Sequence, residues 1–150
     1  MEGAGFDVKK MHVVRIDPYD DVLEGLTSYI EQAGIRQAAV VGGYGTLAAH
    51  HLHWVAGNTL PTENTFQKGE GGTEILAMNG MIVEGAPHVH VALSTPDGAY
   101  GGHLEPGCIA YVLCEIMLAE LDGPEMSHEK VDVEQPGKGK GKAIKLTFGS

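Results

Sequence analysis

The sequence predicts a mainly β-structured domain that contains a single helix, and two observations support this prediction. Apolar residues recur at helical spacing in one place, residues 21–34. Most of the remaining chain up to Leu121 consists of short apolar or alternating segments typical of strands. The chain has 150 residues, of which 43% are hydrophobic, and this suits one domain with a real core.

The helix is predicted over DDVLEGLTSYIEQAG. Its apolar face consists of Val22, Leu23, Leu26, Tyr29, Ile30 and Ala33. Asp21, followed three residues later by Glu24, resembles a capping box, and Gly34 is placed to end the helix. One amphipathic helix with defined ends is therefore expected.

Strands are predicted on both sides of this helix. The first is KKMHVVRI, which ends before Pro18, and the next two are IRQAAVVGGYGT and LAAHHLHWVAG, with the glycines of GGYG (42–45) as a tight connection between them. Residues 57–71 are polar and rich in turn formers, which predicts a loop. TEILAMNGMIV, HVHVALS, AYGGHL and the run 108–121 follow as strands, then a flexible segment at about 122–142 and AIKLTF as a last strand.

Three histidines lie on two of these predicted strands. His88 and His90 are two residues apart, so a strand directs both side chains to the same face. The segment STPDGA has the signature of a type I turn about Pro96 and Asp97. A two-residue loop there places His90 opposite His103, and the three imidazoles then converge.

The loop length decides whether this cluster forms. Pro-Asp-Gly also occurs in three-residue loops with a bulge, and one extra residue turns His103 to the opposite face unless Gly101 and Gly102 absorb the shift. Alternatively, the histidines are ordinary strand residues bonded to backbone or water. We favour a divalent metal site, with zinc as the preferred ion, because three imidazoles leave a fourth position for water or substrate.

Other polar residues give weaker signals. Glu105, close to His103, is a candidate proton carrier, although a solvated turn residue is the simpler interpretation. His51 and His53 form another pair on one strand face and could meet the first cluster from a neighbouring sheet position or subunit. No third ligand is indicated for them, and partly exposed strand histidines are the favoured interpretation.

Composition argues against several classes of protein. With 20 acidic and 10 basic residues the formal charge is -10, which disfavours direct nucleic acid binding, and GKGKGK (137–142) is interpreted as a solvated tail. The cysteines Cys108 and Cys114 lack paired spacing, and neither a leader nor an apolar run long enough to span a membrane is recognisable. A cytoplasmic protein is therefore expected.

The order of the segments GIRQAAVVGGYGTL, GTEILAMNGMI and HVHVALSTPDGAYGGHLEPGCI resembles the plants-and-prokaryotes-conserved (PPC) domain family, from about Val13 to Leu121. The resemblance implies an α+β fold, with a mainly antiparallel sheet, one principal helix packed against it, and assembly as a homotrimer. Members of this family often carry a DNA-binding label. The chain is also similar in fold and histidine arrangement to the acetolactate decarboxylases, whose three histidines hold zinc, and His88, His90 and His103 are the matching positions.

The resemblance supports a metal ion more than a reaction. A decarboxylase of that kind is expected to need an arginine for the substrate carboxylate, whereas Arg15 and Arg36 lie in segments away from the histidines. Glu74, within the EIL element that matches the family, is better explained by a structural or interface role.

Two function classes stay open. The preferred class is a trimeric metal-binding protein that could act on a small oxygenated substrate as a zinc-dependent lyase or hydrolase-like enzyme. The alternative class is a non-enzymatic interaction module associated with DNA-binding or transcription proteins.

Overall fold

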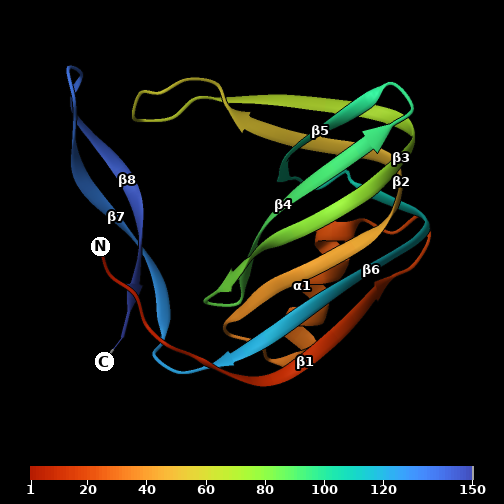
Figure 1. Cartoon of the computed structure of the whole chain (residues 1–150), viewed down its shortest axis with the longest axis horizontal. Helices are drawn as coiled ribbons and strands as arrows, with labels where there is room; N and C mark the ends of the chain where they lie inside the picture. The colour runs from red at the N-terminus through yellow and green to blue at the C-terminus, as the bar shows by residue number, and fades with distance from the viewer. Residues whose placement is uncertain (150) are drawn as a thin grey trace.

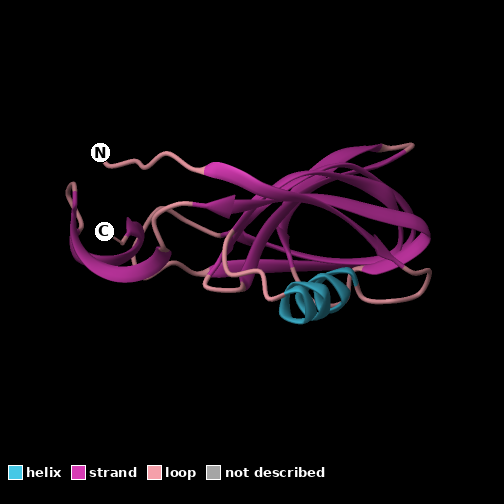
Figure 2. Cartoon of the chain, turned by 90° about the horizontal axis from the view of Figure 1, so that it is seen from below, coloured by secondary structure: helices cyan, strands magenta, loops and turns pink. Residues whose placement is uncertain are grey.

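A computed structural model describes residues 1–149, and its main body is one antiparallel sheet with a helix against it (Figure 1, Figure 2). The strands are β1 (Asp7–Ile16), β2 (Ala38–Val55), β3 (Asn64–Val83), β4 (Ala86–Thr95), β5 (Gly98–Leu104) and β6 (Ile109–Asp122), and the helix is α1 (Val22–Ala33). Their order across the six-stranded sheet is β1-β6-β2-β3-β4-β5. The predicted α+β fold is thus confirmed.

The sheet folds back on itself through β5. This strand pairs with β4 from Thr95↔Gly98 to His90↔His103, and it also pairs with β2 at Leu52↔Leu104 and His53↔His103. β2, β3, β4 and β5 therefore form a closed ring of strand pairings. Leu52 and Leu104 are buried inside this ring. Because side chains alternate along a strand, the neighbouring histidines point outward.

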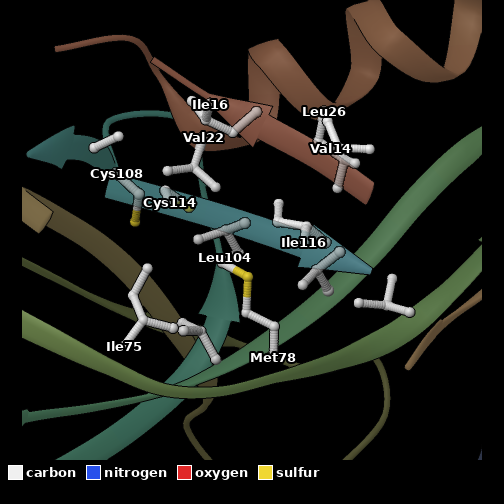
Figure 3. Close-up of a cluster of buried hydrophobic side chains, with 14 of the residues drawn as sticks. Val14, Ile16, Val22, Leu26, Ile75, Met78, Leu104, Cys108, Cys114 and Ile116 are labelled. Carbon is white, nitrogen blue, oxygen red and sulfur yellow. The ribbon is translucent and has the colours of Figure 1, made fainter. Parts of the chain in front are cut away.

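The core lies between the inner face of the sheet and the helix. Figure 3 shows part of it, with Val22 and Leu26 of α1 close to side chains from β1 and β6. Cys108 and Cys114 are fully buried here, and burial raises the pKa of their thiols to about 11 and about 12. Both cysteines are free thiols and act as small core residues.

The helix begins and ends as the sequence predicts. Asp21 Oδ1 accepts hydrogen bonds from the N–H groups of Leu23 and Glu24, both at 3.0 Å. Gly34 takes a left-handed conformation with φ of 67°, and its N–H is directed at the last turn of the helix. The buried face consists of Val22, Leu26 and Ile30. The capping side chain satisfies backbone donors that the helix itself leaves free.

Two predictions about β2 and β3 are wrong. The glycines of GGYG do not connect two strands but lie inside one long strand, where a Cβ on Gly45 would come within 2.2 Å of the Leu113 carbonyl oxygen. They permit close approach of β2 to β6, whose pairing shifts register at this point. Residues 64–71 are strand rather than loop, since β3 pairs with β2 from Asn64 onward. Pairing along a neighbouring strand outweighs their polar composition.

A separate hairpin of β7 (Met126–Gln135) and β8 (Gly139–Phe148) stands beside the main sheet (Figure 1). It includes most of the segment predicted to be flexible, about 122–142, whose mobility stays a prediction. Residues 139–142 of GKGKGK belong to β8 and pair with β7, and Lys142 Nζ lies 2.8 Å from Asp132 Oδ1. Within residues 1–149 no helix is long and apolar enough to cross a membrane.

Asp21 provides a test of this architecture, because it caps α1 and its Oδ2 also accepts a hydrogen bond from Gly107 N–H at 2.5 Å. We expect Asp21→Ala to lower the free energy of unfolding by about 1–2 kcal/mol, since the helix loses its cap. Asp21→Asn keeps a capping oxygen and should cost clearly less. Urea titration followed by circular dichroism measures both, and an Ala variant as stable as the parent would contradict the capping role.

Candidate metal centre

Strand pairing brings three predicted histidines together on the outer face of the ring. Val89 and Val91 of β4 are buried, so the intervening side chains of His88 and His90 are directed outward. His103 of β5 is the direct partner of His90. The connection is the two-residue loop, and the pairing of β4 with β5 shows no bulge. The register prediction is therefore confirmed.

The three rings are close enough to share one ion. Nε2 of His88 and Nε2 of His90 are 3.2 Å apart. The centroid of the His103 ring lies 4.5 Å from that of His88 and 5.5 Å from that of His90. One ligand atom from each residue lies within 4.8 Å of the others. Such a set can hold a divalent ion and leave a coordination position open.

The electrostatics of the site favour neutral rings at His88 and His103. Burial lowers the pKa of His103 to about 4, and the adjacent rings of His88 and His53 add to the effect. Partial burial of the ring also lowers the pKa of His88, although the residue as a whole is exposed, and His90 is the next cause. Metal binding requires the unprotonated imidazole. At neutral pH the rings of His88 and His103 therefore each have a nitrogen lone pair available for a metal ion.

His53 is a fourth histidine at the site. It lies directly opposite His103 across the short pairing of β2 with β5, and the two ring centroids are 4.3 Å apart. The sequence left open whether the His51 and His53 pair meets the first cluster, and His53 does so from a neighbouring strand. The H-x-H spacing of His51 and His53 was the only sequence signal, because nothing local predicts that β5 pairs with two strands.

Glu105 is held against His53. Its Oε1 lies 2.5 Å from His53 Nδ1, and the side chains of Glu105 and His53 are only 23% and 17% exposed. An ionised carboxylate only accepts hydrogen bonds, so Nδ1 is the donor. The interpretation of Glu105 as a solvated turn residue is therefore wrong, because β5 ends beside β2 and places it next to the cluster. A role in proton transfer stays a prediction.

A cavity of about 640 Å³ opens beside these rings. Its lining includes all four histidines together with Trp54 and Asn79. Trp54 donates its indole N–H to the Gly101 carbonyl, and this hydrogen bond holds the ring in place beside the cavity. Gly102 allows this arrangement, since a Cβ there would come within 2.8 Å of the His53 carbonyl oxygen. Gly101 and Gly102 thus permit close packing and do not compensate for a register shift.

The remaining candidates lie away from the cavity. Arg15 pairs with Asp17 at 2.6 Å, and Arg36 reaches the carbonyl oxygen of Glu84 and the carboxylate of Glu125. Glu74 lines a different cavity near Ser94 and Tyr111. Neither arginine lines the histidine cavity.

The lowered pKa of His103 predicts how the metal-free chain responds to acid. The unfolded chain takes up a proton near pH 6.5, whereas folded His103 does so only near pH 4. Folding stability that is present above pH 6.5 is therefore lost as the pH falls toward 4. NMR titration of the ring should give a midpoint near 4, and His88→Ala should raise it by removing a repulsive neighbour. A midpoint close to 6.5 would contradict the buried environment.

Comparison with known proteins identifies the family. The model of the Plants and Prokaryotes Conserved (PCC) domain matches residues 4–122. The bifunctional protein GlmU of Synechococcus sp. (strain JA-2-3B'a(2-13)) is 30% identical over 119 residues, which are 77% of this chain but only 17% of GlmU. This chain thus spans about a sixth of that curated relative.

Two solved structures share the fold. A plant- and prokaryote-conserved protein of Pyrococcus horikoshii is similar with a TM-score of 0.74 and 24% identity, covering 97% of this chain and 100% of that one. The metal-containing protein AF0104 of Archaeoglobus fulgidus is similar with a TM-score of 0.73 and 24% identity, covering 86% and 93%. The match of the family model over residues 4–122 shows that the chain belongs to the Plants and Prokaryotes Conserved domain family.

Proposed function

We propose that the chain is a metal-binding protein in which His88, His90 and His103 hold one divalent ion, with zinc as the preferred ion. The observation that carries this proposal is the 3.2 Å separation of Nε2 in His88 and Nε2 in His90. Two nitrogens bound to one tetrahedral zinc at about 2.0–2.1 Å lie about 3.3 Å apart. The pair is thus already spaced for a common ion, and His103 is the third donor beside it.

All three histidines of this set line the cavity. Three protein ligands leave a fourth position for water or a ligand oxygen, which is the pattern of catalytic rather than structural zinc. A bound ion would polarise a carbonyl group or lower the pKa of a water molecule there. Asn79 and Trp54 line the same space and suit a small oxygenated molecule. The description of the Archaeoglobus fulgidus neighbour as metal-containing agrees with this proposal.

Direct nucleic acid binding has less support. Two lysines of β8, Lys140 and Lys142, lie near Glu134 and Asp132 of β7, and these acids offset the charge that would attract phosphates. The net charge of -10 acts in the same direction. A protein partner is compatible with either function class.

Zinc titration tests the metal site, and Trp54 provides an internal probe because it is the only tryptophan of the chain and lines the same cavity. We expect untagged protein to hold about one equivalent of zinc in elemental analysis. Co²⁺ or Cu²⁺ should quench the fluorescence of Trp54 through their d-electron absorption, and His103→Ala should abolish both signals. Arg15→Ala, outside the cavity, is the control and should bind like the parent. Protein that takes up no zinc at neutral pH would refute the proposal.

We further propose that copies of the chain associate through the outer face of β1, β6 and β2, and the family resemblance implies three copies. Exposed apolar side chains gather on these strands: Met11, Val13, Val41, Tyr44, Tyr111, Val112, Leu113 and Met117. Val13 is 71% exposed and pairs with Met117 across β1 and β6, which makes the patch continuous between strands. Exposed apolar patches of this kind mark interfaces, and in a closed ring of three copies different parts of this face would contact one another.

A charge placed in this face should prevent assembly. Light scattering after size exclusion should give the mass of three chains for the parent and of one chain for Met117→Glu, because burying an unpaired carboxylate is costly. Ile144→Glu is the matched control, since Ile144 is 60% exposed on the separate hairpin. A parent chain that remains monomeric at micromolar concentration would contradict the proposed association.

A further inference from the structure

We propose that His53, His103 and Glu105 form a second position for a divalent metal ion, which competes with the first position for His103. This inference rests on the proposed metal-binding function and adds a site to it. The three donors come from β2, from β5 and from the residue directly after β5. One ligand atom from each lies within 4.8 Å of the other two.

The chemistry of this second set suits a metal ion. Two histidines and one glutamate are a ligand combination that zinc uses in catalytic sites. The carboxylate would neutralise one of the two charges of the ion, whereas the first set contains only neutral donors. The side chains of His53 and Glu105 are 17% and 23% exposed, while His88 and His90 are exposed residues. The second position is therefore better shielded from water, which strengthens attraction between an ion and a carboxylate.

A proton now occupies the place that the ion would take. The 2.5 Å separation of His53 Nδ1 and Glu105 Oε1 is that of a hydrogen bond. Metal bonds of about 2.0–2.2 Å require a donor separation of about 3.3 Å, so the carboxylate would withdraw by less than about 1 Å. Glu105 can make this movement, because its backbone N–H is held by the His51 carbonyl at 3.1 Å while its side chain, among residues 1–149, is hydrogen-bonded only to His53.

Because His103 belongs to both positions, only one of the two positions can hold an ion at a time. A neutral imidazole has one N–H and one free lone pair, so His103 can serve one ion at a time. The parent protein should thus hold a single ion. Loss of His88 and His90 should move the ion to the second position instead of eliminating binding. The second position alone depends on Glu105.

Zinc uptake by a set of variants separates the two positions. The double variant His88→Ala/His90→Ala should still bind about one zinc, with an affinity roughly tenfold or more below that of the parent, because the ion must there displace the proton between His53 and Glu105. Adding Glu105→Gln should abolish this residual binding, because the amide lacks the charge and donor strength of the carboxylate. Adding Glu31→Gln in place of Glu105→Gln is the control, since it removes an equal charge from helix α1. Elemental analysis and calorimetry give stoichiometry and affinity, and circular dichroism verifies folding.

Each other outcome overturns the inference. A parent that holds one zinc together with a double variant that holds none would leave the proposed function intact and refute the second position. Residual binding that survives Glu105→Gln would place the ion elsewhere. Two zinc ions on the parent would refute the competition for His103. A parent without zinc would refute the proposed function and the second position together.

Discussion

The arrangement of the candidate site depends on the double pairing of β5. This strand is hydrogen-bonded to β4 on one side and, over two residue pairs, to β2 on the other. His103 is thereby flanked by His90 and by His53 in direct register. Without the contact to β2 the cluster would be a three-histidine hairpin open to water on one side. The closed ring also fixes which face of each strand is buried, so the outward direction of the histidines follows from the core.

The sequence predicted those parts of this arrangement that depend on residues close to one another in the chain. The helix was predictable because Asp21, the apolar spacing and Gly34 all lie within fourteen residues. The hairpin was predictable because the turn at Pro96 and Asp97 sets the register that places His90 opposite His103. Both predictions relied on interactions between residues that are near in sequence, where geometry follows from residue type.

The missed features all depend on contacts distant in sequence. His53 joins the cluster because it pairs with His103, fifty residues later in the chain, and no sequence motif predicts this pairing. Residues 64–71 were assigned to a loop from their polarity, although the long partner strand β2 orders them. The glycines of GGYG were interpreted as a connection, although they serve the close approach of β6 at Leu113. The composition of a segment indicates how exposed to solvent it is, but it does not indicate which strand lies next to it.

The tight packing at Gly102 has a consequence for altering this protein. The His53 carbonyl and the ring of Trp54 leave no volume for any side chain at that position. β5 is thus a fixed part of the cavity lining, whereas Asn79 on β3 is exposed and pairs with His90 of β4. Efforts to redirect the chemistry of the pocket toward new small molecules should accordingly vary β3 and preserve the glycines.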